Sequence, residues 1–184
     1  MSPAYDRGVN ETVPDPHPET ARLLAAATGR LAAAGARDEV LADYVPPRRV
    51  LLLQRESTMR PLGRVWRLGP ILLAPDGAVY ATGEITRAVD PLWPGYQSVS
   101  AERRRDYRGA AFRSRIADGD TVNHGARRLA LDEAALGTGA EPIFLRDGTP
   151  FIIWSATLGR AAAAELGPFL DDRIELLLAP PPGA

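Results

Sequence analysis

The sequence contains no cysteine and no lysine, and it has only two histidines among its 184 residues. Without cysteine there is no thiol nucleophile, no disulfide and no thiolate metal site. Without lysine there is no Schiff-base chemistry, no lysine-based phosphate loop and no Ser-Lys catalytic pair. His17 lies in a proline-rich N-terminal stretch, which leaves His124 as the single imidazole of the expected folded part. We therefore predict no metal site and no cofactor.

Long hydrophobic runs are also missing. No apolar run approaches the roughly 20 residues that a membrane-spanning helix needs, and the N-terminus lacks the basic-then-apolar pattern of a signal peptide. We therefore predict a cytoplasmic protein that makes no membrane contact. Its length and its apolar fraction of 45% are typical of one globular domain. We expect a flexible lead-in over residues 1–18 and a single domain over residues 19–184.

The charges are distributed unevenly although the net charge is only -1. Residues 48–128 contain 15 arginines and 8 acidic residues, whereas the two flanks together contain 7 arginines and 15 acidic residues. A basic middle segment is able to attract an anionic ligand or nucleic acid. The alternative, which we favour, is that the acidic flanks pair with the basic middle, because most charged faces are solvated or paired.

Two Asp-Gly pairs predict two β-hairpins, because the central positions of the common two-residue turns need positive φ. In the first, Asp76-Gly77 places Trp66 opposite Arg87 and Arg67 diagonal to Glu84. In the second, Asp147-Gly148 places Leu145 opposite Pro150. The apolar run 48–54, preceded by Pro46-Pro47, predicts one buried central strand.

Helical spacing of apolar residues predicts helices over 19–34, 37–44 and 100–117, and a C-terminal helix from 159 that is interrupted at 167–168. The segment 127–131 is predicted to be a strand. Hairpins outnumber βαβ units in this order of elements. We therefore predict an α+β fold with a largely antiparallel sheet of about five to six strands, built from the two Asp-Gly hairpins, with N-terminal, middle and C-terminal helices.

The segments 43–49, 53–60 and 63–68 (DYVPPRR, LQRESTMR and GRVWRL) carry a resemblance to a known family. They resemble a family of short, uncharacterised proteins of GC-rich bacteria, some of which carry the name glutaminase. The resemblance implies hydrolysis of an amide. Serine-type glutaminases use a Ser-x-x-Lys motif, whereas this chain has Ser57-Thr-Met-Arg60. Arginine stays protonated at neutral pH and so cannot act as the general base that a lysine can.

Three hypotheses of function follow. The first is a non-enzymatic ligand-binding or protein-interaction domain with an arginine-rich groove, because no nucleophile–base pair can be assembled from motifs. The second is an amide hydrolase, and the third is a nucleic-acid-associated protein that uses the arginines of 103–115. Candidate ligand-binding residues are Arg55, Arg60, Trp66, Arg67, Arg87 and Tyr96, and candidate catalytic residues are Glu56, Ser57, Glu84 and His124.

The expected partners are an anionic small molecule, a protein, or a second copy of the chain. Nucleic acid is disfavoured, because basic patches that bind it usually come with a recognisable module or stacking aromatics. The segment 118–125 superficially resembles a metal-binding loop, but it lacks the closing glutamate of the calcium-loop pattern. His124 is better explained as a structural residue or as a lone acid–base group.

Overall fold

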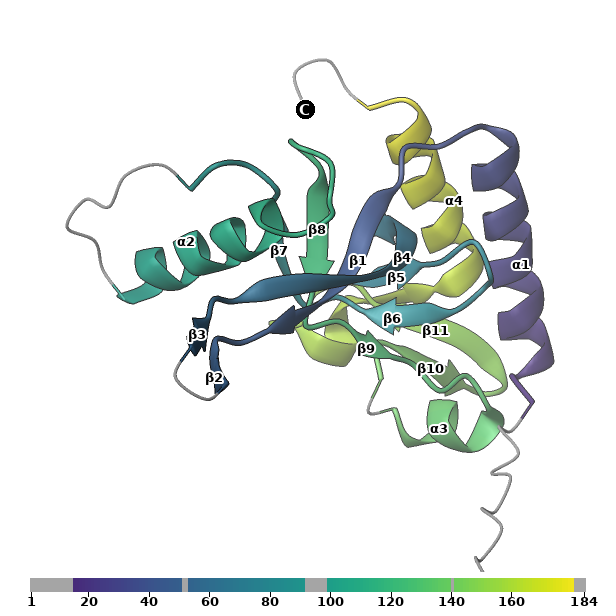
Figure 1. The fold of residues 1–184 in the computed structure, drawn as a ribbon. Coiled ribbons are helices and arrows are strands. Elements are labelled where there is room, and N and C mark those ends of the chain that lie inside the picture. Colours follow the sequence, from purple (N-terminus) through teal and green to yellow (C-terminus); the bar gives the residue numbers. More distant parts are fainter. Residues whose placement is uncertain (1–14, 51–52, 92–98, 140, 181–184) are drawn as a thin grey trace, which may run out of the picture.

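The computed structural model describes residues 15–50, 53–91, 99–139 and 141–180. The helices are α1 (Pro18–Ala33), α2 (Val99–Phe112), α3 (Glu133–Thr138) and α4 (Leu166–Leu178), with a 3-10 turn η1 (Gly159–Ala162). The strands are β1 (Glu39–Val45), β2 (Arg48–Val50), β3 (Leu53–Arg55), β4 (Thr58–Leu68), β5 (Ile71–Leu73), β6 (Val79–Ala81), β7 (Glu84–Arg87), β8 (Thr121–His124), β9 (Arg127–Arg128), β10 (Ile143–Arg146), β11 (Thr149–Ile153) and β12 (Ala163–Glu165). These elements confirm the predicted α+β class (Figure 1).

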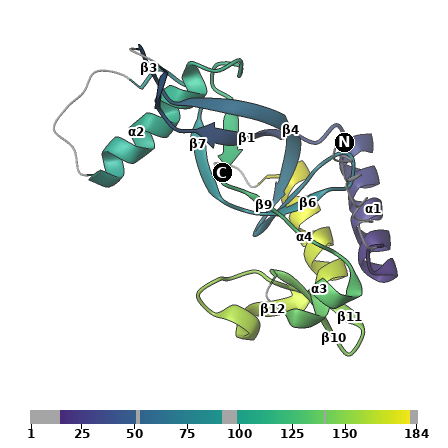
Figure 2. The ribbon, with the colours of Figure 1, turned by 60° about the horizontal axis from the view of Figure 1, so that its bottom comes forward.

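The main sheet closes on itself. Its strand order is β7-β8-β1-β4-β5-β6-β9, but β6 and β7 are separated by two residues, and so are β8 and β9. The two pairs share one antiparallel register, from Tyr80 opposite Arg128 to Arg87 opposite Thr121. Strands β6 and β7 are therefore two halves of one interrupted strand, and β8 and β9 are two halves of its partner. Because these two strands stand at both ends of the strand order, the sheet is closed, and Figure 2 shows β1, β4, β6, β7 and β9 curving around one centre. Closure leaves few free strand edges.

Three apolar clusters hold the fold together. Leu41, Val65 and Leu72 fill the inside of the closed sheet. Outside it, α1, α4 and the separate sheet β10-β11-β12 cover the face of β4, β5 and β6, in a core that includes Leu31, Ile71 and Ile152. Helix α2 covers the face of β1, β4 and β8 on the other side (Figure 1). The protein thus has a large core at one end and a small one under α2.

The predicted number and pairing of the strands are wrong. The main sheet has seven strands rather than five to six, and β1 pairs with β8 in parallel. The second Asp-Gly hairpin has its predicted register, with Leu145 opposite Pro150, and Asp147 and Gly148 both have positive φ. That hairpin lies in the separate three-stranded sheet, not in the main one.

The first Asp-Gly hairpin has a different register. The Gly77 N–H donates to the Ala74 carbonyl, and the Ala74 N–H donates to the Ala78 carbonyl, so the loop has three residues and Leu73 lies opposite Val79. Pro75 favours a type I turn, and Gly77 with φ of +84° completes the three-residue loop.

A second turn had no counterpart in the prediction, and it changes the partners of β4. Gly69, with φ of +64°, and Pro70 turn the chain between β4 and β5. Trp66 therefore pairs with Leu73, and Arg67 pairs with Leu72. The predicted pairings of Trp66 with Arg87 and of Arg67 with Glu84 are wrong for this reason.

The run 48–54 is not one buried strand. Strands β2 and β3 pair with each other, with Arg48 opposite Arg55. They continue the register of β1 and β4, in which Val45 lies opposite Thr58. We call residues 46–50 and 53–57 the arm, because this hairpin projects beyond the sheet (Figure 1). Pro46 and Pro47 interrupt the ladder, because proline has no N–H to donate.

Several other boundaries differ from the predictions. The segment 37–44 contributes to strand β1 rather than to a helix, because Val40, Leu41 and Ala42 are buried between β4 and β8. The middle helix ends at Phe112 rather than near 117, and strand β9 covers only two residues. Helix α4 runs through Pro168 without a break, since a proline is tolerated in the first turn of a helix. Helix α1 begins at Pro18 and is followed by Gly35 with φ of +58°, close to the prediction.

Closure of the sheet depends on Gly83, the residue just before β7. A Cβ atom on Gly83 would lie 2.3 Å from the His124 carbonyl oxygen and 2.5 Å from the Gly125 carbonyl oxygen. We predict that Gly83→Ala lowers the free energy of unfolding by about 3 kcal/mol or more, because a rigid backbone must move. Gly63→Ala is the matched control, because Gly63 also lies in a strand of this sheet and has no atom within 4 Å of its Cβ position. Equal urea unfolding curves for the two variants would contradict the prediction.

Candidate functional site

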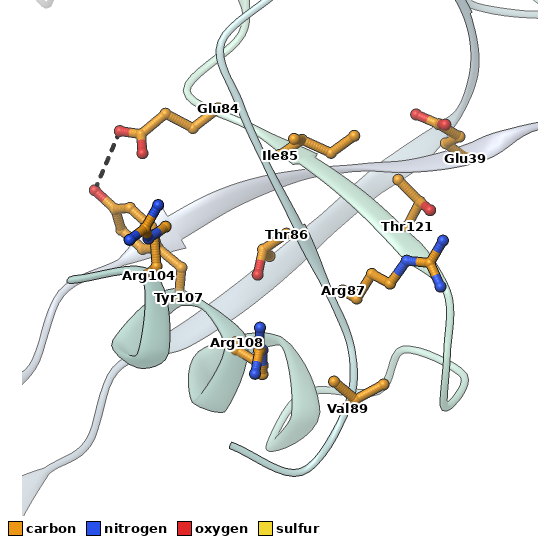
Figure 3. A pocket seen from close by; sticks show the side chains of 10 residues that line it. All are labelled: Glu39, Glu84, Ile85, Thr86, Arg87, Val89, Arg104, Tyr107, Arg108 and Thr121. Atoms are coloured by element: carbon orange, nitrogen blue, oxygen red, sulfur yellow. Dashed lines mark hydrogen bonds between the residues drawn. The ribbon is translucent and has the colours of Figure 1, made fainter. Parts of the chain in front are cut away.

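A pocket of about 450 Å³ lies between α2 and β7 (Figure 3). Strand β7 contributes side chains from both of its faces, because Glu84 and Thr86 lie on the α2 side, whereas Ile85 and Arg87 alternate to the other side. The full lining is Glu39, Glu84, Ile85, Thr86, Arg87, Val89, Arg104, Tyr107, Arg108 and Thr121. The pocket combines an apolar wall with charged groups, as ligand sites commonly do.

The three arginines of this pocket outnumber its two glutamates. Arg87, Arg104 and Arg108 form no ion pair with any residue that the structure describes. Of the two glutamates, Glu39 already lies 3.5 Å from Arg67 Nε and accepts a hydrogen bond from Asn123 Nδ2. The pocket therefore has an excess of positive charge.

The other end of the pocket holds Tyr107, whose hydroxyl donates to Glu84 Oε1 at 3.5 Å (Figure 3). The Tyr107 ring packs against the His124 ring with 4.3 Å between their centroids. His124 is 3% exposed, and its Nε2 atom has no hydrogen-bond partner among the described residues. Burial lowers the pKa of His124, although the nearby Glu84 carboxylate acts in the opposite direction. His124 is therefore neutral in the folded protein at neutral pH.

A second polar cluster fixes α2 to the sheet. Asp106 on α2 accepts hydrogen bonds from the Tyr44 hydroxyl and, at 2.5 Å, from the Ser57 hydroxyl. Arg113 donates to the Ser57 hydroxyl and to the Ser57 carbonyl, both at 2.9 Å. Burial and the Asp106 carboxylate raise the pKa of Tyr44 to about 12. The Tyr44 phenol is therefore a proton donor over the whole physiological range.

A third polar group lies at the inner face of the closed sheet. Asn123 is fully buried, and its amide group accepts from Arg67 and donates to Glu39. Asn123 and His124 are adjacent in β8, so they point to opposite faces of the sheet. Arg67 and His124 therefore lie on opposite sides of the strand.

The predicted ligand-binding residues do not form one groove. Arg87 lines the pocket between α2 and β7, whereas Arg55 lines a different groove beside the arm. Arg60 is paired with Asp43, and Arg67 is engaged with Asn123 and Glu39. Trp66 is 5% exposed and donates its indole N–H to the Ala36 carbonyl, so it belongs to the core. Tyr96 lies outside the described residues.

The predicted catalytic residues lie in two places. Glu84 lines the pocket and is the cross-strand partner of His124. Ser57 and Glu56 belong to the cluster around Arg113, where Glu56 forms an ion pair of 3.1 Å. The Ser57 side chain is 2% exposed, and its hydroxyl is engaged by Asp106 and Arg113. Ser57 forms no hydrogen bond with His124 in the described part of the chain.

Asp106, Arg113 and Tyr107 were not among the predicted site residues. In the sequence they are three members of an arginine-rich helix, and nothing in the helical pattern distinguishes them from their solvated neighbours. Tyr107 lies three residues after Arg104, and Arg108 lies four residues after Arg104, so both are neighbours of Arg104 on the helix surface, and this spacing is the one sequence signal for the site.

Comparisons of the chain with protein-family models, with curated proteins and with solved structures find no match. None of the described helices combines the length and the apolar character needed to cross a bilayer. In the described ranges, no three histidine, aspartate or glutamate side chains gather in a way that would hold a metal ion. The site is therefore interpreted from its own chemistry.

We predict that Asp106→Ala lowers the free energy of unfolding by about 1–3 kcal/mol, because it leaves the partly buried Tyr44 and Ser57 hydroxyls without their acceptor. Asp118→Ala, at an exposed residue of the loop that follows α2, should change it by less than about 0.5 kcal/mol. Urea unfolding measures both values. Equal losses for the two variants would show that the cluster contributes nothing specific.

The lowered pKa of His124 predicts a stability change on the acid side. The unfolded chain binds a proton at His124 near pH 6.5, whereas burial in the folded state opposes protonation. The free energy of unfolding should therefore fall as the pH decreases through about 6.5. His124→Phe keeps a ring against Tyr107 and removes this contribution. Unfolding curves between pH 7.5 and 5 should show a smaller loss for the variant, and parallel losses would contradict the prediction.

Proposed function

We propose that this protein is a ligand-binding domain that holds a small organic anion in the pocket between α2 and β7. The observation that carries the proposal is the set of three arginines, Arg87, Arg104 and Arg108, around one pocket without a carboxylate partner among the described residues. Guanidinium groups bind carboxylates and phosphates through paired, charge-assisted hydrogen bonds.

The size and the lining of the pocket support a small molecule. A volume of about 450 Å³ is within the range of known ligand pockets. Ile85, Val89 and Tyr107 provide an apolar wall for the body of the ligand, and Thr86 and Thr121 provide hydroxyl groups. Ile85 is 54% exposed, which is high for a large aliphatic side chain in a strand. A ligand that covers Ile85 removes apolar surface from water.

The charges also suggest how the ligand is oriented. Arg108 lies at the end of the pocket near Val89, and Glu84 lies at the other end, beside the Tyr107 hydroxyl (Figure 3). An anionic group therefore fits near Arg108 on the α2 side of β7, while Arg87 on the other face of this strand adds to the positive potential, and a hydrogen-bond donor of the ligand fits near Glu84. The amide-hydrolase alternative has less support, because Ser57 is buried and engaged in hydrogen bonds.

Binding can be tested with a panel of small anions, namely inorganic phosphate, citrate, glutamate and a nucleoside monophosphate, with glutamine as a compound without net charge. At least one anion should raise the melting temperature, because a ligand that binds only the folded state stabilises it. The variant Arg87→Ala/Arg108→Ala should bind this anion at least about tenfold more weakly, because each hydrogen bond to a charged group contributes about 1.5–3 kcal/mol.

The control variant is Arg22→Ala/Arg146→Ala, which removes the same charge from α1 and β10, outside this pocket. It should bind the anion as the wild type does. The proposal is refuted if no anion of the panel raises the melting temperature. It is also refuted if the two double variants bind the anion equally weakly. Titration calorimetry on the same proteins gives the affinities and the stoichiometry.

A further inference from the structure

One end of the molecule holds several arginines that form no ion pair with a described carboxylate. Four ion pairs join the basic middle of the chain to its acidic flanks, namely Arg60–Asp43, Arg64–Asp38, Arg67–Glu39 and Arg127–Glu141. Pairing between flanks and middle is therefore real but incomplete. Besides Arg104 and Arg108 of the pocket, the arm and the α2 segment hold five arginines that form no ion pair with a described carboxylate: Arg48, Arg49, Arg55, Arg103 and Arg115.

The arm places two of these charges directly against each other. Arg48 and Arg55 are cross-strand partners, so their side chains share one face of the arm. Like charges in directly opposed positions destabilise a strand pair. The Glu56 carboxylate lines the same groove, but its ion pair is with Arg113, and neither Arg48 nor Arg55 forms an ion pair with a described carboxylate. A counter-charge from a bound partner would remove this cost.

Arg48 and Arg55 line a groove of about 560 Å³ together with Arg113, which follows the end of α2. Arg113 is held in place by its ion pair with Glu56 and its hydrogen bonds to Ser57. The groove therefore contains the Arg113 guanidinium paired with the Glu56 carboxylate, and two guanidinium groups of the exposed arm without an ion pair, which gives it an excess of positive charge. This arrangement is separate from the pocket between α2 and β7, with which it shares no lining residue.

We propose that the arm and α2 bind the sugar–phosphate backbone of a nucleic-acid duplex, with one phosphate seated in the groove of Arg48, Arg55 and Arg113. A single small anion would fill the groove and leave the charges of Arg103 and Arg115 on the α2 segment uncompensated. A row of phosphates would engage them as well, because most contacts of duplex-binding proteins go to the backbone.

The composition of the arm favours a duplex over a single strand. Proteins that bind single strands stack the bases on aromatic side chains, and the arm sequence contains no aromatic residue. The sequence alone disfavoured nucleic acid because it showed no recognisable module. The structure adds the spatial grouping of arm and helix, which the order of residues does not reveal (Figure 1).

The overall charge of the protein makes this surface selective. With a net charge of -1, the chain has no general attraction to a polyanion. Asp171, Asp172 and Glu175 lie on α4, which belongs to the large core rather than to the α2 side (Figure 1). A duplex would therefore bind at the end of the molecule that carries the arm rather than at α4.

The test is fluorescence anisotropy with a labelled 24-base-pair DNA duplex, the matching RNA duplex and one single strand, each titrated between 50 and 300 mM salt. At least one duplex should bind more tightly than the single strand, and its affinity should fall steeply as salt increases. The variant Arg48→Ala/Arg55→Ala should lower the slope of log affinity against log salt by about 0.9, because the two arginines share one phosphate and each phosphate contact adds about 0.9. At 0.1 M salt this corresponds to about tenfold weaker binding for the double variant.

Two controls keep the result interpretable. The pocket variant Arg87→Ala/Arg108→Ala tests whether any loss of arginine has the same effect, and Arg22→Ala/Arg146→Ala removes charge elsewhere. Circular-dichroism melting shows whether the variants remain folded, as expected because Arg48 and Arg55 are exposed. The proposal fails if neither duplex binds at 50 mM salt, if the single strand binds more tightly, or if the arm variant binds a duplex as the wild type does. Failure here leaves the small-anion proposal intact, because that proposal depends on different arginines of the pocket.

Discussion

The pairing of β6 and β7 with β8 and β9 is the constraint on which the rest of the structure depends. One continuous register joins the two ends of the main sheet, and Gly83 permits the backbones to approach where the strands are interrupted. Closure gives each strand an inner and an outer face. Adjacent residues of β8 therefore have different roles, since Asn123 joins the inner polar group and His124 packs under α2.

The position of α2 follows from this outer face. Its contact with the sheet is made largely by small side chains, Ala110 and Ala111, which bring the helix close but bury little apolar area. Apolar burial contributes about 25 cal/mol for each Å², so this small core needs support from directional bonds. The hydrogen bonds of Asp106 and Arg113 supply it. The helix is thus fixed by polar groups, and its flanks are left to form the pocket on one side and the groove on the other.

The sequence was informative where structure is local. The turn at Asp147-Gly148 was predicted correctly because two consecutive residues with positive φ specify it. The turn at Asp76-Gly77 was assigned the wrong length because Pro75 favours a type I turn, and the Gly69-Pro70 turn then changed every partner of β4. Strand β1 was mistaken for a helix because its partners, β4 and β8, come from distant segments. The candidate sites depend on the same non-local pairings. The sequence alone therefore could not show that Ser57 and His124 lie in two different places of the fold.

The absence of lysine gives the charged surfaces one further property. Arginine stays protonated at every physiological pH, so the positive charge of the pocket and of the arm is constant. Burial keeps His124, which packs against Tyr107 of the pocket, neutral near pH 7. Any pH dependence of anion binding near neutrality must therefore come from the ligand, for example from the second ionisation of a phosphate near pH 6. A carboxylate ligand would bind without such a dependence, so the pH profile distinguishes the two classes of anion.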